Sequence, residues 1–228
     1  MHNPPARTRI KLCGMTRRED IDAAIDCGAD ALGLVFYQGS ARHVSVARAA
    51  ELLRGLPPFV AAVGLFVNAS VDEVRAAVSA APLSMLQFHG DETLEQCAVL
   101  AEAVGLPFLR AIRVTPAMRG ADLLEYDLLS RQRSALFSSL LLDTWVDGYG
   151  GSGKVFDWSI VPEQLAPRVV LSGGLSAQNA TEAVVQVRPC AVDVSSGIEA
   201  AKGIKDDARM RAFVAAVRLA DVTRTHSQ

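Results

Sequence analysis

The chain has 228 residues, half of them hydrophobic, which is enough to bury a full core and lies in the range where a barrel remains one domain. Its formal net charge is −2 and its acidic and basic residues are interspersed, so it lacks the Lys/Arg stripe that binds a nucleic-acid backbone. Because the sequence contains neither a signal-peptide core nor an apolar run of bilayer length, we expect a cytoplasmic protein with no nucleic-acid or membrane partner.

From its N-terminus onward the chain repeats one pattern, in which a short apolar and β-branched run is followed by a glycine-rich or polar corner and a longer amphipathic segment. This pattern predicts successive βα units. Eight runs are predicted as strands, at 9–14, 31–37, 59–67, 85–90, 108–114, 140–144, 168–174 and 191–197. Helical spacing is clear at 18–30, 71–80 and 94–105, and Gly28 and Gly105 stand at plausible C′ positions.

Eight such units predict the α/β class and a single-domain (β/α)8 TIM barrel over residues 1–228, with disordered ends at about 1–7 and 222–228. An open doubly wound sheet shows the same alternation of strands and helices. The count of eight, without an obvious switch in strand order, favours the barrel.

The segment 148–154 reads GYGGSGK and matches both a dinucleotide-binding and a P-loop pattern. A P-loop needs Ser or Thr after its lysine, and here Val155 follows. Both patterns also need a long helix next, whereas the chain soon reaches Pro162. We therefore interpret Gly148 to Ser159 as a glycine-rich lid loop after the sixth strand.

Small residues follow the seventh and eighth predicted strands, in LSGGL (171–175) and VSSGI (194–198). Barrels commonly bind phosphate at these turns, where backbone N–H groups can approach the anion. The alternative is that the glycines only make tight turns. The two motifs together predict a phosphate site formed by Gly173, Gly174, Ser195, Ser196 and Gly197.

Cys13 ends the first predicted strand and Asp143 ends the sixth, so both side chains are expected at the barrel mouth. A thiolate can act as a general base where its neighbours stabilise it, and a carboxyl kept protonated can act as a general acid. A lone cysteine is more often an inert core residue, and Cys27, Cys97 and Cys190 are interpreted that way. The four cysteines form no CxxC pair, so we expect neither a disulfide framework nor a metal site.

Three further side chains are candidates for substrate binding. Arg42 lies in the loop after the second strand, where its guanidinium could bind a carboxylate with two parallel bonds or remain solvated. Gln87 and His89 alternate on the fourth strand and therefore point to the same side, either to bind substrate or to bond within the core.

Nearly the whole chain resembles the phosphoribosylanthranilate isomerase family of tryptophan biosynthesis. The resemblance rests on KLCGMT (11–16), GADALGLVFY (28–37), SARHV (40–44), VGLFVN (63–68), LQFHGDE (86–92), LLDT (141–144), GGSGKVFDW (150–158), LSGGL (171–175) and DVSSGIE (193–199). Phe88 departs from the family's usual leucine, but alternation places it opposite Gln87 and His89.

The resemblance implies a small-molecule substrate, N-(5-phosphoribosyl)anthranilate, and an Amadori rearrangement without metal or organic cofactor. It implies that Asp143 is the acid, Cys13 the base, and Arg42 the residue that binds the anthranilate carboxylate. The SGG and SSG turns match the family's phosphate-binding loops, and Asp193 is implied to face the anthranilate side.

Three alternatives remain at this point. The chain could be another phosphosugar isomerase or epimerase barrel, a relative that also accepts an imidazole-carboxamide substrate, or a barrel that binds a phosphometabolite without catalysis. Relatives with two substrates usually carry an aspartate where this chain has Cys13, which favours the anthranilate enzyme. The presence of both Cys13 and Asp143 argues against a non-catalytic barrel.

Overall fold

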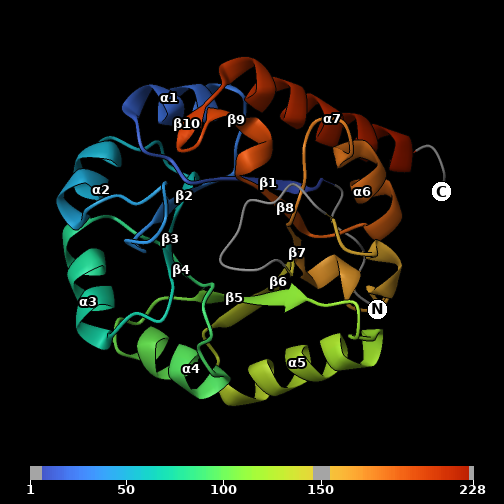
Figure 1. The fold of residues 1–228 in the computed structure, drawn as a ribbon, viewed down its shortest axis with the longest axis horizontal. Coiled ribbons are helices and arrows are strands. Elements are labelled where there is room, and N and C mark those ends of the chain that lie inside the picture. The colour runs from blue at the N-terminus through green and yellow to red at the C-terminus, as the bar shows by residue number, and fades with distance from the viewer. Residues whose placement is uncertain (1–6, 146–154, 226–228) are drawn as a thin grey trace.

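The computed structural model describes residues 7–145 and 155–225, and eight parallel strands in it form a closed barrel in sequence order (Figure 1). The strands are β1 (Arg9–Cys13), β2 (Ala31–Val35), β3 (Ala61–Phe66), β4 (Met85–Phe88), β5 (Phe108–Val114), β6 (Phe137–Thr144), β7 (Val170–Leu171) and β8 (Ala191–Val194). The predicted (β/α)8 barrel is confirmed.

Helices surround the barrel as an outer ring (Figure 1). They are α1 (Arg18–Asp26), α2 (Val46–Leu52), α3 (Val71–Ala80), α4 (Leu94–Glu102), α5 (Gly120–Arg133), α6 (Ala180–Val187) and α7 (Asp207–Thr225). In the described part of the connection between β6 and β7, two short 3-10 helices, η1 (Trp158–Ile160) and η2 (Ala166–Arg168), stand where the repeat predicts an α-helix. After β8 come a third 3-10 turn, η3 (Ser196–Ile198), and an antiparallel hairpin of β9 (Glu199–Ala201) and β10 (Ile204–Lys205).

The ring closes where β8 pairs with β1, with Lys11 opposite Asp193 in the register. Alternation along the strands gives the barrel interior two zones. Apolar residues such as Leu109, Leu141 and Val170 fill one zone, and polar side chains occupy the inward positions nearer the C-terminal strand ends. The outward strand residues pack under the helices, where the ring of Phe88 lies between those of Phe66 and Phe108, as alternation predicted.

Most element boundaries differ from the sequence prediction by a few residues. β7 has only Val170–Leu171, because Gly173 and Gly174 adopt positive φ angles of 82° and 66° that turn the chain out of the sheet. β6 begins at Phe137, earlier than the predicted 140. Gly28 follows the C-cap of α1 with φ 92°, as expected, whereas Gly105 lies one residue beyond the expected C′ position of α4.

Part of each end of the chain that the sequence predicted to be disordered is ordered in the structure. α7 continues to Thr225, and Arg7 forms an ion pair with Asp30. Residues 1–6 and 226–228, and residues 148–154 of the predicted lid, lie outside the described residues. No helix in the described ranges is long and apolar enough to cross a membrane.

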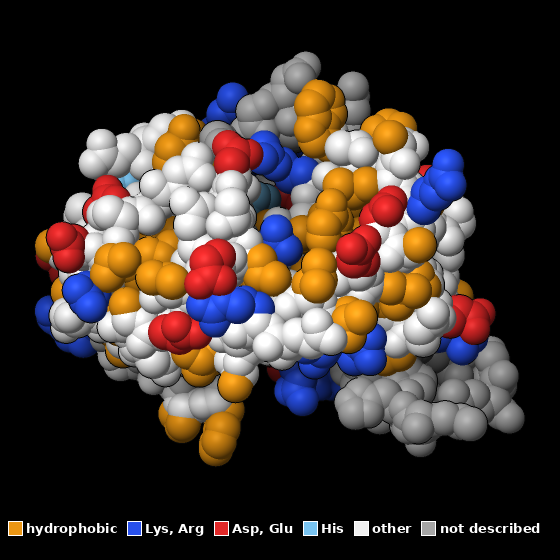
Figure 2. All heavy atoms as spheres, turned by 90° about the horizontal axis from the view of Figure 1, so that it is seen from below, with side chains coloured by type: hydrophobic (Ala, Val, Ile, Leu, Met, Phe, Trp, Pro, Cys, Tyr) orange, Lys and Arg blue, Asp and Glu red, His pale blue; other side chains and the backbone are white. Residues whose placement is uncertain are grey.

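Surface charges of both signs are scattered over the side of the barrel that Figure 2 presents, and neither sign dominates it. Oppositely charged side chains also pair between neighbouring helices: the guanidinium of Arg133 on α5 bonds to both Glu95 and Glu102 on α4. This agrees with the interspersed charges of the sequence.

Candidate active site

A pocket of about 840 Å³, part of it open to solvent, lies at the C-terminal ends of the barrel strands. Its wall contains ten of the residues that the sequence singled out: Cys13, Arg42, Gln87, His89, Asp143, Gly173, Gly174, Asp193, Ser195 and Ser196. The barrel therefore brings the candidate base, acid, carboxylate-binding and phosphate-binding residues to one cavity.

Cys13, the last residue of β1, is buried in the pocket floor with 4% of its surface exposed. Its neighbour in the register is Gly33 on β2, and a Cβ atom added to Gly33 would lie 2.5 Å from the Cys13 sulfur and 3.0 Å from Lys11 Nζ. Glycine at position 33 thus leaves the space that the thiol and the ammonium group share. A larger residue could not occupy it without moving one of them.

Lys11 precedes Cys13 by two residues and points into the barrel with it. Its Nζ donates a hydrogen bond to Asp193 Oδ1 at 2.9 Å, and both side chains are buried. Burial opposes the charge on Lys11, but the negative charge of Asp193 and the contact with Cys13 outweigh it and raise the lysine's pKa. Lys11 is therefore a cation held beside the thiol.

Two opposing effects act on the thiol itself. Burial raises the pKa of Cys13 above its ordinary value, and the charge of Lys11 acts in the opposite direction. Sequence reasoning identified Cys13 and missed Lys11, although a lysine inside an otherwise apolar strand, two residues before the cysteine, was a visible signal.

Asp143 lies near the end of β6, and two hydrogen bonds from described residues hold its carboxyl group. Its Oδ1 accepts from the Thr144 backbone N–H at 2.8 Å, and its Oδ2 lies 2.9 Å from His89 Nε2. His89 Nδ1 in turn lies 2.9 Å from Gln87 Nε2. The predicted alignment of Gln87 and His89 is confirmed, and the two residues form a chain that ends on the carboxyl of Asp143.

The turn after β7 passes very close to that carboxyl group. A Cβ atom added to Gly173 would lie 2.4 Å from the Thr144 nitrogen and 2.7 Å from Asp143 Oδ1. Gly173 is therefore needed for its positive φ and also for the approach of the two strand ends.

The turn after β8 contributes Ser195 and Ser196 to the pocket wall. Gly197 is not part of that wall. It packs against the turn after β7, where an added Cβ would lie 2.0 Å from the Leu175 carbonyl oxygen. Gly197 thereby allows the two small-residue turns to lie against each other.

Arg42 reaches the pocket from the loop after β2, but its guanidinium already has a partner. Nε and Nη2 donate to the two carboxylate oxygens of Glu199 at 2.7 and 2.8 Å. Sequence reasoning did not foresee this pair, because Glu199 lies 157 residues further along the chain.

In the described ranges no group of His, Cys, Asp and Glu side chains could hold a metal ion. The chemistry offered by the pocket residues is proton transfer by a thiol and a carboxyl group, together with binding of anions.

Comparison with known proteins gives one consistent result. A family profile described as N-(5'phosphoribosyl)anthranilate (PRA) isomerase matches residues 10–216. The N-(5'-phosphoribosyl)anthranilate isomerase of Herminiimonas arsenicoxydans is 62% identical over 215 residues, which cover 94% of this chain and 95% of that protein. The enzyme of the same name from Ralstonia nicotianae is 58% identical over 227 residues, covering 96% of each chain.

Solved structures show the same similarity. Phosphoribosyl anthranilate isomerase from Thermotoga maritima superposes with a TM-score of 0.80 at 39% identity, over 92% of this chain and 98% of that one. A phosphoribosyl anthranilate isomerase in complex with reduced 1-(o-carboxyphenylamino)-1-deoxyribulose 5-phosphate gives a TM-score of 0.77 at 36% identity, with the same coverage.

Proposed function

Because the chain belongs to the N-(5'-phosphoribosyl)anthranilate isomerase family, we propose that Cys13 is its general base and Asp143 its general acid. The reaction is the isomerisation of N-(5'-phosphoribosyl)anthranilate to 1-(o-carboxyphenylamino)-1-deoxyribulose 5-phosphate in tryptophan biosynthesis. The substrate is a small molecule with a carboxylate at one end and a phosphate at the other.

The chemistry requires one proton donor and one proton acceptor. Protonation of the furanose ring oxygen opens the ring to a Schiff base, and removal of the C2′ proton then gives an enolamine. The enolamine becomes the ketone when its hydroxyl loses a proton and carbon C1′ gains one. The proton count balances, and the reaction neither consumes nor produces electrons.

One observation carries the assignment: Cys13 and Asp143 line a single pocket from strands that are separated in the ring by β7 and β8. The turns after β7 and β8 are the proposed phosphate site, formed by Gly173, Gly174, Ser195 and Ser196. A phosphate bound there extends the sugar between the thiol and the carboxyl group.

The surroundings of each group fit its proposed role. Lys11 places a positive charge where the Cys13 thiolate forms, which offsets part of the cost of ionising a buried thiol. His89 and the Thr144 N–H fix the orientation of Asp143 and leave the carboxyl in the pocket wall. We assign His89 and Gln87 this supporting role, in addition to contact with substrate.

The two ends of the substrate are assigned to Arg42 and the small-residue turns. Arg42 binds the anthranilate carboxylate, and Asp193, which is hydrogen-bonded to Lys11 and lines the pocket, is assigned to the anthranilate side. As an enzyme of amino-acid biosynthesis the protein is proposed to act in the cytoplasm.

The test is steady-state kinetics on Cys13→Ala and Asp143→Ala, combined with binding of the reduced product analogue. Each substitution is expected to lower kcat by at least about a hundredfold, the usual contribution of a positioned acid or base, while the analogue still binds. Near-normal turnover in either variant contradicts the role assigned to that residue.

A further inference from the structure

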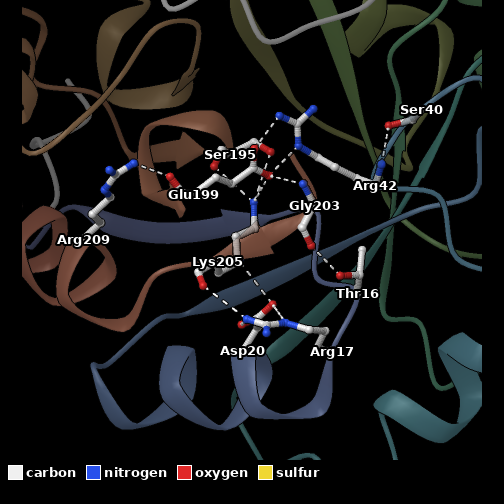
Figure 3. Close-up of polar contacts among 10 residues, drawn as sticks. All are labelled: Thr16, Arg17, Asp20, Ser40, Arg42, Ser195, Glu199, Gly203, Lys205 and Arg209. Atoms are coloured by element: carbon white, nitrogen blue, oxygen red, sulfur yellow. Dashed lines mark hydrogen bonds and ion pairs between the residues drawn. The ribbon is translucent and has the colours of Figure 1, made fainter. Parts of the chain in front are cut away.

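The guanidinium of Arg42 is held by a buried carboxylate before any substrate arrives. Glu199 accepts hydrogen bonds from Nε and Nη2 of Arg42 in a bidentate pair, and its side chain is only 6% exposed (Figure 3). No described residue bonds to Nη1, the remaining nitrogen of the guanidinium. Arg42 therefore has one edge fixed by the protein and one nitrogen available to the pocket.

Glu199 is itself held by a second cation. Lys205 Nζ lies 2.9 Å from Glu199 Oε1, and the lysine side chain has no exposed surface. The same Nζ donates to the Ser195 carbonyl oxygen at 3.1 Å, in the turn proposed to bind phosphate. Although burial raises it, the hydrogen bonds from Arg42 and the charge of Lys205 hold the pKa of Glu199 below its ordinary value.

The hairpin that carries these two residues is fastened to the helices on either side. Asp20 of α1 accepts a hydrogen bond from the Lys205 backbone N–H at 3.3 Å, and Arg17 donates to the Lys205 carbonyl oxygen at 3.3 Å. On the other side, Arg209 of α7 donates to the Glu199 carbonyl oxygen (Figure 3). The β9–β10 hairpin is thus a fixed platform for Glu199 and Lys205.

The aliphatic part of Arg42 is confined as well. A Cβ atom added to Gly14, the residue after Cys13, would lie 2.5 Å from Arg42 Cδ and 3.2 Å from Ser195 Oγ. The arginine stem therefore lies against the backbone that follows the proposed base. Its guanidinium and its stem are both restrained.

The charges along this chain of contacts leave a surplus of one positive charge. Burial lowers the pKa of Lys205, but the charge of Glu199 opposes this effect, so we count Lys205 and Arg42 as cations and Glu199 as the anion between them. Arg42 lines the pocket, whereas Glu199 and Lys205 are not in its wall, so the surplus faces the ligand. A ligand carboxylate bound to Arg42 neutralises the remaining positive charge of Arg42, Glu199 and Lys205.

We propose that Glu199, held by Lys205, is a positioning residue that orients Arg42 for the carboxylate of the substrate. Lys205 links the same hairpin to the Ser195 turn, so the hairpin sets the spacing between the carboxylate-binding and phosphate-binding ends of the site. The pocket then selects ligands that carry both anions at that spacing. This inference rests on the proposed role of Arg42.

The experiment compares two ligands in wild type, Glu199→Gln and Arg42→Ala. One ligand is the reduced product analogue, and the other is the same molecule with hydrogen in place of the carboxylate. Glu199→Gln removes the charge and one acceptor at nearly constant size. We expect it to weaken binding of the carboxylate ligand by at least about tenfold, as for loss of a charge-assisted hydrogen bond, and to change binding of the other ligand by less than about twofold.

Kinetics and a double mutant separate this inference from the proposed function. KM for the substrate should rise in Glu199→Gln with kcat largely retained, and Glu199→Gln should add no further loss of carboxylate binding in the Arg42→Ala background. If Arg42→Ala leaves carboxylate binding unchanged, the proposed role of Arg42 is wrong. If Arg42→Ala weakens it and Glu199→Gln does not, only the positioning role is wrong.

Two further variants control for stability. Glu51→Gln removes an exposed carboxylate that pairs with Arg48 at 3.1 Å, and it should change neither ligand's binding. Glu199→Asp keeps the charge beside Lys205 but shortens the side chain by one methylene. It replaces Glu199→Gln as the test variant if Glu199→Gln does not fold. Equal weakening of both ligands in the Glu199 variants would mean a general structural role and would overturn the proposal.

Discussion

Lys11 and Asp193 face each other across the seam where β8 joins β1, with Nζ and Oδ1 2.9 Å apart. The pair lies beside Cys13 and puts a positive and a negative charge near one thiol. Lys11 lowers the pKa of Cys13 and Asp193 raises it, against a background in which burial raises it. Substitutions of Lys11 and of Asp193 should therefore shift the pKa of the Cys13 thiol in opposite directions.

We expect Lys11→Met to move the ascending limb of the pH profile of kcat/KM to higher pH. The thiolate loses its stabilising charge, so a higher pH is needed to form the base. Asp193→Asn should move the same limb to lower pH. Alkylation of Cys13 as a function of pH, measured by mass spectrometry, reports the same titration independently of turnover.

Lys11→Met also leaves Asp193 as an unpaired buried charge, which costs about 3–5 kcal/mol of stability. The profiles should therefore be recorded well below each variant's Tm. Shifts of the same sign in both variants would show that the two charges do not act on Cys13 as assigned.

Gly33→Ala should lower kcat, because its methyl group has no space beside the Cys13 sulfur and Lys11 Nζ. A displaced base costs up to about a hundredfold in rate. The matched control is Gly55→Ala, at a position with φ 71° and nothing within 4 Å of an added Cβ. That variant should lose about 1 kcal/mol of stability through backbone strain and keep its kcat. Equal kcat in the two variants would contradict the crowding argument.

His89→Ala should lower kcat by about tenfold to a hundredfold, because among the described residues only the Thr144 N–H then remains to orient the Asp143 carboxyl group. His43, an exposed histidine in the loop after β2, provides the control, and His43→Ala should leave kcat unchanged. Steady-state assays at saturating substrate measure both. An unchanged kcat in His89→Ala would limit His89 to a packing role.

Ser70→Ala should cost about 1 kcal/mol of stability with no change in activity, because Ser70 and Glu73 form a capping box at the start of α3. Hydrogen bonds from the Ser70 backbone and side chain lower the pKa of Glu73. The contribution of Glu73 is thus present above its unfolded pKa and is lost as pH falls through its lower folded pKa. The Tm difference between wild type and Glu73→Gln should be largest near neutral pH and should vanish once the pH falls below the lowered pKa of Glu73. A difference that persists in acid would mean that the carboxylate charge is not its source.

The barrel and most of the pocket residues were predictable because their signals are local. A residue at the end of a predicted strand must lie at the mouth, and alternation fixes which neighbours share its side. That reasoning correctly predicted that one pocket contains Cys13, Asp143, Gln87 and His89.

The partners of these residues were not predictable in the same way. Lys11 meets Asp193 only because the first strand pairs with the last, and Arg42 meets Glu199 through a hairpin that is no part of the βα repeat. Nothing in the sequence pattern assigns a role to Gly33, because its contact with Cys13 depends on the register between β1 and β2. Contacts of this kind depend on closure of the ring.

Catalysis also depends on closure of the ring, because the Lys11–Asp193 pair beside Cys13 spans β1 and β8. Thr8, just before β1, bonds through its backbone N–H and its hydroxyl to Asp221 in α7, so the beginning and the end of the chain meet at the same seam as Lys11 and Asp193. A folding intermediate in which β8 and α7 have not docked has every residue of β1, including Cys13 and Lys11, but lacks Asp193 beside them. Such an intermediate also lacks the Ser195–Ser196 turn that follows β8, so we expect turnover during refolding to appear only after β8 has paired with β1.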